Sequence, residues 1–128
     1  MVDHNLSPRL ARSIQLLFPD HQIVALRDKF PPDVSDIDWI TTLDAEGGWA
    51  VLTRDLRLRT RPHERAALDR SRIVYFFIGG AWRKYSVPEM AARLIGLMPI
   101  MATQTEIASS GRFELPINAG SKLRPHRD

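Results

Sequence analysis

Residues 73–80 read IVYFFIGG. The first six residues are all apolar, and two glycines then end the run. A strand with no polar residue along its length is expected to be covered on both faces, as in parallel sheets that pack between helices. This stretch therefore predicts an α/β fold.

Helical and extended patterns alternate on both sides of this strand. Helices are expected at residues 8–18, 35–46, 62–69 and 87–107, and short strands at residues 1–3, 22–26, 50–53 and 113–117. Ser–x–x–acid capping patterns mark two of the helix starts, at Ser35 and at Ser86, and Ser7 followed by Pro8 marks a third. Strands that alternate with helices predict a mainly parallel sheet.

Two helices carry more detailed expectations. In the helix that starts after Ser35, the apolar spacing places Ile37, Ile40 and Leu43 on the buried face. In the last long helix, Pro99 is expected to kink or divide the helix, because proline lacks the backbone N–H. The inward residues of that last helix are expected to be Met90, Leu94, Leu97, Met98 and Met101.

The chain has the length of one domain and the composition of a folded protein. Of its 128 residues, 44% are hydrophobic and 26% are charged, and none is cysteine, which excludes disulfides and thiolate metal sites. No leader pattern and no run near ~18 apolar residues occurs, so we expect a cytoplasmic protein. We expect the domain to span residues 1–118, with a mobile basic tail at 119–128.

Charge is distributed unevenly along the chain. Residues 1–46 hold eight acidic and four basic residues, whereas the remainder holds seven acidic and fourteen basic ones. Such asymmetry favours an acidic pocket beside a basic surface, an arrangement that suits a metal-assisted site on a polyanion. Solvated charges on helix faces are the alternative explanation.

Three aspartates are expected at one edge of the sheet. Asp3 and Asp55 each follow an expected strand, and Asp36 begins a helix, whose positive end favours an anion. If the three converge, their repulsion is costly unless a cation lies among them. Mg²⁺ or Mn²⁺ prefers such oxygen ligands, and a bound ion can polarise a phosphodiester and activate a water.

Each aspartate also has a structural explanation. Asp36 and Asp38 are both placed to cap their helix, and Asp3 stands in a sequence that favours a turn. Asp55 has arginine neighbours and can form an exposed salt bridge, which contributes little to stability. The spacing alone leaves both explanations open for all of them.

The aspartate at position 55 lies within a cluster of basic residues. Residues 50–65 read AVLTRDLRLRTRPHER, with arginines at Arg54, Arg57, Arg59, Arg61 and Arg65. Guanidinium groups bind phosphates in bidentate fashion and position a nucleic-acid strand without reading its bases. The alternative is a solvated basic loop.

The remaining polar candidates are less specific. His63 and Glu64 stand at an expected helix start, where capping and lining of a site explain them equally well. Asp28 follows an expected strand and either supports the metal ligands from behind or is a solvated loop residue. The four histidines show no metal-ligand spacing, so a zinc site is not expected.

Four short motifs occur in order over residues 3–55: DHNLSPRLARSIQ, RDKF, SDIDWI and VLTRD. With them the chain resembles PIN-like domains, specifically the small bacterial PIN-like proteins related to VapC-type toxins. The resemblance implies a three-layer α/β/α fold and an acidic Mg²⁺ or Mn²⁺ site that cleaves RNA. The family's acids fall on Asp3, Asp36 and Asp55, with Asp38 as an alternative for the second position. Asn5 and Asp28 match flanking positions.

These observations together predict a metal-dependent endoribonuclease, the toxin of a toxin–antitoxin pair. Catalysis is expected from Asp3, Asp36 and Asp55, and metal binding from these three and Asp38. Substrate binding is expected from Asn5, Arg54, Arg57, Arg59 and His63. An antitoxin protein would then cover the cleft, and a homodimer is compatible with the sequence. The alternative function is a non-catalytic module that keeps the fold and binds nucleic acid or protein.

Overall fold

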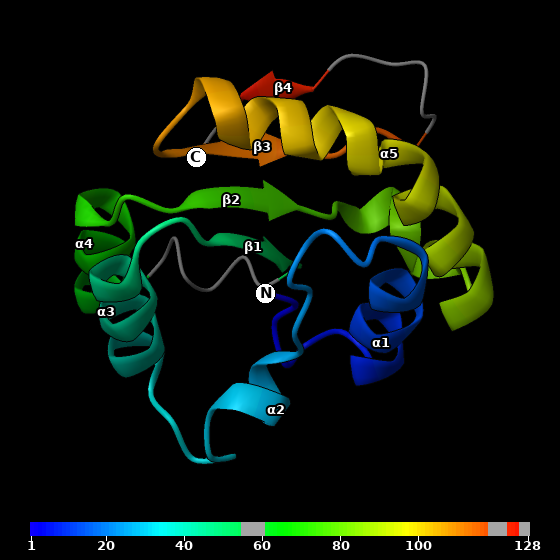
Figure 1. Ribbon diagram of the computed structural model, residues 1–128. Helices are drawn as coiled ribbons and strands as arrows, with labels where there is room; N and C mark the ends of the chain where they lie inside the picture. Colours follow the sequence, from blue (N-terminus) through cyan, green and yellow to red (C-terminus); the bar gives the residue numbers. More distant parts are fainter. Residues whose placement is uncertain (55–60, 118–122, 126–128) are drawn as a thin grey trace.

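Three parallel strands form the centre of the structure, as the sequence predicts. The computed structural model describes residues 1–54, 61–117 and 123–125. The strands are β1 (Ala50–Thr53), β2 (Val74–Phe77) and β3 (Gly111–Glu114), arranged side by side in that order (Figure 1). β2 is the middle strand, and all four of its residues are buried.

Side chains of β2 alternate between two separate hydrophobic clusters. Val74 and Phe76 belong to one cluster, and Tyr75 and Phe77 belong to the other. Helices pack against both faces of the sheet and contribute to each cluster: α1 (Pro8–Leu17) and α5 (Val87–Ile107) to one, α3 (Asp36–Glu46) and α4 (Pro62–Arg70) to the other (Figure 1). The predicted three-layer α/β/α arrangement is therefore confirmed, and it explains why the 73–78 stretch contains no polar residue.

Two single-residue bridges extend the sheet beyond β1. Val2 pairs in parallel with Leu52 of β1 on one side and with Ala25 on the other. The backbone N–H of Asp3 then donates to the Leu52 carbonyl at 2.9 Å. This short pairing places Asp3 at the carboxyl edge of the sheet, beside the end of β1.

The prediction of a strand at residues 22–26 is wrong. Only Ala25 takes part in a bridge, and Leu26 already begins the short helix α2 (Leu26–Lys29). The expected first strand is likewise reduced to the bridges at Val2. A strand persists only where a neighbour supplies ladder hydrogen bonds, and Val2 offers residues 22–26 a single paired position.

Side-chain hydroxyls begin α1, α3 and α5 as the sequence predicts. Ser7 caps α1, Ser35 caps α3 by accepting from the Asp38 N–H at 3.1 Å, and Ser86 forms a complete capping box with Glu89. Each serine oxygen satisfies a backbone donor that the first helical turn leaves without a partner. The start of α3 therefore has a fixed position relative to the sheet.

The buried face of α3 differs from the expected one. Trp39, Ile40 and Leu43 are buried, whereas Ile37 is 39% exposed. The placement of Ile37 on the inner face is therefore wrong. Trp39, Ile40 and Leu43 lie on one side of the helix at helical spacing, and the larger indole fills the space against the sheet.

α5 continues through Pro99, so the proline does not divide the helix, and the alternative expectation of a kink stays a prediction. Leu97 and Met101 are buried on either side of it and pack in the same cluster as β2 residues. This packing holds the helix together across the hydrogen bond that proline cannot make. Met90 and Leu94 are also buried as expected, whereas Met98 is only partly buried.

Three features of the chain after β2 differ from the expectation. β3 begins at Gly111 and ends at Glu114, earlier than the expected strand at 113–117. Arg124–Pro125, which were assigned to a mobile tail, form β4 and pair antiparallel with β3. A short 3₁₀ helix, η2 (Gly80–Lys84), links β2 to α5 and was not expected. The domain boundary at residue 118 stays a prediction.

Candidate acidic site at the carboxyl ends of the strands

Asp3 is a buried carboxylate at the edge of the sheet where the parallel strands end. Its side chain is 1% exposed, although charged groups are rarely buried without partners. Val2 fixes its position by pairing with strand residues on both sides. Sites in open parallel sheets form at this edge, so the fold places Asp3 where the sequence predicted it.

Four hydrogen-bonding groups orient the Asp3 carboxylate. Thr53, the last residue of β1, donates its hydroxyl to Oδ2 at 2.7 Å. The side-chain amide of Asn5 donates to the Thr53 oxygen at 3.2 Å. On the other oxygen, the His4 backbone N–H donates to Oδ1 at 2.7 Å, and His4 Nδ1 lies 2.9 Å from the same atom. The carboxylate is therefore held in one orientation.

Burial raises the pKa of Asp3 above the ordinary value for a carboxyl group. The hydrogen bond from Thr53 and the contact with His4 act in the opposite direction, because they favour the charged form. The negative charge of Asp36 adds to the increase. Asp3 and Asp36 thus interact electrostatically although 33 positions separate them in the sequence.

Asp36 is the first residue of α3, and its side chain is held in place. The indole Nε1–H of Trp39 donates to Asp36 Oδ1 at 2.9 Å, and Trp39 itself is fully buried. Asp36 is half-buried, whereas Asp38 is exposed on the same first turn. The arrangement favours Asp36 over Asp38 as the partner of Asp3.

The third expected acid, Asp55, lies outside the described residues, as do Arg57 and Arg59. Within residues 1–54, 61–117 and 123–125, no group of three His, Cys, Asp or Glu side chains is arranged to hold a metal ion. In the part of the chain that the structure describes, the charge of Asp36 acts on Asp3, and the convergence of all three acids on one metal ion stays a prediction.

Asn5 and Arg54 connect the acidic site to the end of β1. The backbone N–H of Arg54 donates to Asn5 Oδ1 at 3.4 Å, so Asn5 bridges Thr53 and Arg54. The guanidinium Nη2 of Arg54 lies 3.7 Å from the sulfur of Met90, a weak acceptor. Its Nε is buried and has no hydrogen-bond partner among the described residues.

The other candidates lie away from the Asp3 carboxylate or have structural partners. Asp28 accepts from Arg12 of α1 at 3.1 Å, in an exposed ion pair. Glu64 lies 3.6 Å from Arg61 at the start of α4, and His63 is exposed beside it. These contacts explain the residues structurally and leave their predicted roles at the site as predictions.

Thr53 and His4 contact Asp3 directly, yet neither was a candidate in the sequence. A signal existed for Thr53, which stands two residues before Asp55 in the VLTRD motif. Because side chains alternate along a strand, Thr53 and Asp55 would fall on the same face of an extended β1. His4 gave no such signal, since its contact with Asp3 depends on the turn that follows Val2.

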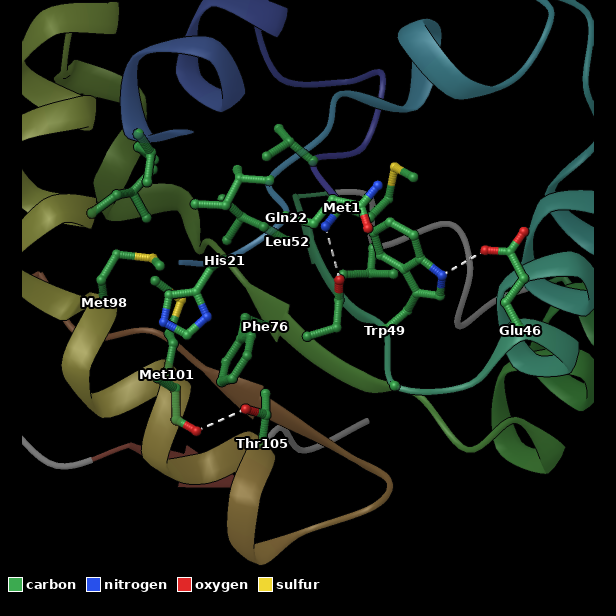
Figure 2. Close-up of a pocket in the computed structure, with 18 of the residues that line it drawn as sticks. Met1, His21, Gln22, Glu46, Trp49, Leu52, Phe76, Met98, Met101 and Thr105 are labelled. Carbon is green, nitrogen blue, oxygen red and sulfur yellow. Dashed lines mark hydrogen bonds between the residues drawn. The ribbon is translucent and has the colours of Figure 1, made fainter. Parts of the chain in front are cut away.

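A large pocket lies at the opposite edge of the sheet. It has a volume of about 470 Å³, and its lining includes Trp49, which precedes β1, and Met98 and Thr105 of α5 (Figure 2). Of the residues that the structure describes, neither Asp3 nor Asp36 lines it. The pocket is therefore separate from the acidic site.

Comparison with known protein families assigns the chain to a family. A model of the PIN-like domain matches residues 1–80, which is more than half of the chain. The chain belongs to the PIN-like domain family. The match covers the motifs at residues 3–55 and every predicted acid, and PIN domains are generally nucleases. Searches of curated proteins and of solved structures found no match.

Membership of the PIN-like family agrees with the layered fold and the edge at which Asp3 lies. Within the described parts of the chain, no helix is both long enough and apolar enough to cross a membrane. PIN-like nucleases typically use divalent metal ions and act on nucleic acid.

Proposed function

We propose that the protein is a metal-dependent endoribonuclease that hydrolyses RNA phosphodiester bonds at the acidic site. The observation that carries this proposal is the buried carboxylate of Asp3, whose pKa is raised by burial and, in addition, by the charge of Asp36. A fold that keeps two interacting carboxyl groups at the functional edge of a PIN-like sheet incurs an electrostatic cost. A bound cation offsets that cost.

The donor set fits Mg²⁺ or Mn²⁺. Asp3 and Asp36 offer carboxylate oxygens, and the neighbouring side chains of Asn5 and Thr53 offer further oxygen atoms. Hard divalent ions prefer such ligands over nitrogen or sulfur. In this proposal Asp3, Asp36 and Asp55 hold the ion, with Asp38 as the alternative to Asp36. The bound ion supplies a Lewis acid and an activated water.

The protein side chains position the substrate and the acids. Thr53 orients the Asp3 carboxylate through its hydroxyl, and Trp39 orients Asp36 through its indole N–H. Arg54, whose backbone N–H donates to Asn5 beside the site, is proposed to contribute its guanidinium to a substrate phosphate. The remaining substrate contacts proposed are those of Asn5, Arg57, Arg59 and His63, supported from behind by Asp28 and Glu64.

We extend the proposal to the biological role. The motif order at residues 3–55, which resembles that of proteins related to VapC-type toxins, supports a toxin that an antitoxin protein inhibits. The antitoxin would cover the acidic edge and bring a cation that competes with the metal ion for Asp3 and Asp36. Action in the cytoplasm and formation of a homodimer belong to the same proposal.

One observation favours a second candidate function. Both oxygens of Asp3 already accept hydrogen bonds from within the chain. A site satisfied in this way can persist without metal, so the second candidate is a PIN-like module that binds RNA or protein without cleaving it.

A Mn²⁺ titration separates the two candidates. Thermal unfolding of the wild type is expected to shift upward with Mn²⁺, because the ion binds only the folded state. The shift and the cleavage of a fluorescent RNA should both disappear in Asp3→Asn and in Asp55→Asn. Asp69→Asn, which removes an exposed carboxyl group on α4, is the matched control and should keep both. Cleavage that persists in Asp3→Asn would rule out this site as the origin of the activity.

A further inference from the structure

Arg27 and Arg54 each follow a residue that pairs with Val2, next to the acidic site. Val2 lies in register between Ala25 and Leu52. Two residues further along each of the three segments stand Arg27, His4 and Arg54. Because Val2 lies between the two residues with which it pairs, the chain that leads to Arg27, in α2, and the chain that leads to Arg54 lie on opposite sides of the segment that carries Asp3.

The side chain of Arg27 is anchored at the rim of the site. Its Nη2 donates to the His4 carbonyl at 3.2 Å, and the residue is exposed. A guanidinium has five N–H donors, so this bond leaves further donors for an anion. The adjacent carboxylate is used elsewhere, because Asp28 accepts from Arg12. Arg27 is thus a cation fixed beside the residue that follows Asp3.

On the opposite side, Arg54 presents a guanidinium with weak local partners. Its Nη2 faces the Met90 sulfur at 3.7 Å, and its buried Nε has no acceptor among the described residues. A guanidinium beside a thioether is stabilised far less than one beside an anion. The acidic site therefore has an arginine residue on each side, because Arg27 donates to the His4 carbonyl and the backbone N–H of Arg54 donates to Asn5.

We propose that a single strand of RNA lies across the ends of the parallel strands, with Arg27 and Arg54 holding the phosphates on either side of the scissile one. The inference rests on the proposed function and deepens it, since it assigns the path of the substrate and adds Arg27 as a substrate-positioning residue. Arginine–phosphate pairs fix the register of a strand and carry no sequence information, so the path is independent of base identity.

Binding measurements without metal test Arg27 independently of cleavage. The probe is a 12-nucleotide fluorescein-labelled RNA, titrated with protein in EDTA at several salt concentrations. Arg27→Gln should weaken binding by about tenfold and lower the slope of log K against log salt by about 0.7, the effect of one phosphate contact. Arg72→Gln, at the opposite end of β2 with an exposed side chain, should change neither quantity.

A conservative variant separates positioning from folding. Arg27→Lys keeps the charge but loses the planar fork, so it should restore the salt slope without the full affinity. If Arg27→Gln and Arg72→Gln bind RNA equally well, with equal salt slopes, the inference is wrong. The same conclusion holds if Arg27→Lys behaves like Arg27→Gln in both quantities.

Cleavage assays then test the path itself. An RNA whose phosphate next to the scissile one is a neutral methylphosphonate should be cut about tenfold less efficiently by the wild type. The methylphosphonate should not lower the cleavage efficiency of Arg27→Gln any further, because Arg27 and the replaced phosphate form a single contact. Additive losses would overturn the assigned path.

The two proposals fail in different ways. Metal-free RNA binding that depends on Arg27, without cleavage by the wild type in Mn²⁺, would contradict the nuclease and keep the RNA path. Metal-dependent cleavage with no effect of Arg27→Gln on binding would keep the nuclease and contradict the path.

Discussion

Thr53 donates a 2.7 Å hydrogen bond to the buried carboxylate of Asp3, which lies 50 residues earlier in the chain. The bond joins the end of β1 to the residue that follows the Val2 bridge, and both residues are almost completely buried. It connects the sheet, which sets the fold, to the acid on which the proposed function depends.

Replacing Thr53 with valine should therefore impair the site more than the fold. The variant keeps the shape but removes the donor, and loss of such a supporting bond lowers metal affinity or activity by about 10- to 100-fold. The free energy of unfolding should fall by about 1–3 kcal/mol, because the Asp3 carboxylate loses a partner in a buried position. Thr53→Ser keeps the hydroxyl and should retain most of the metal affinity and most of the stability. Mn²⁺ titration measures the first, and urea unfolding measures the second.

The raised pKa of Asp3 predicts a pH dependence of stability. Because the folded-state pKa lies above the unfolded one, ionised Asp3 costs stability at neutral pH, and this cost disappears as pH falls towards the unfolded value. In EDTA, the wild type should gain stability relative to Asp3→Asn between pH 7 and pH 4.5. Urea unfolding at both pH values measures the difference in the free energy of unfolding between the wild type and Asp3→Asn. A difference that stays constant, or that changes in favour of Asp3→Asn, would contradict the raised pKa.

Trp39 is expected to position Asp36. In Trp39→Phe the hydrogen bond to Asp36 is lost while most of the aromatic bulk stays. Mn²⁺ affinity should fall several-fold, and unfolding should become easier by about 1–3 kcal/mol. Trp49→Phe is a matched control, because it removes an equivalent indole bond to Glu46, beside the pocket at the opposite edge of the sheet. Equal Mn²⁺ affinities in the two variants would show that Trp39 is only a core residue.

Gly47 ends α3 with a φ of 78°, a conformation that favours glycine. A Cβ at this position would meet no atom within 4 Å, so the cost of Gly47→Ala is purely conformational, about 1–2 kcal/mol. An added Cβ at Gly80 would also meet no atom within 4 Å, but the φ of Gly80 lies outside the left-handed region. The free energy of unfolding of Gly80→Ala should therefore stay within about 0.5 kcal/mol of that of the wild type. Thermal unfolding of the two variants tests this contrast, and equal melting temperatures would contradict the strain at Gly47.

Local patterns in the sequence predicted the elements whose signals are local. The serine caps at Ser7, Ser35 and Ser86 depend on contacts within one helical turn, and all three are confirmed. The apolar run at 73–78 predicted a strand buried on both faces, because burial alone determines its composition. The motif order at residues 3–55 predicted the PIN-like family, which the family model confirms.

Long-range contacts decided what these patterns could not. Residues 22–26 have the composition of a strand, but Val2 offers them one paired position, so only Ala25 forms a bridge. Ile37 fits the helical spacing of α3, but the sheet accommodates Trp39 instead. A strand needs a neighbour and a buried face needs an opposing surface, and neither is encoded in the segment itself.

The sequence by itself determined the layered fold, the helix starts and the family, because composition, capping and motif order act locally or along the chain. Tertiary structure decided that Asp3 is buried, that Thr53 and His4 hold it, and that Arg27 lies at its rim. The physical reason is that burial and hydrogen bonding of a carboxylate depend on groups that approach it from distant parts of the chain, and these groups meet only when the sheet forms.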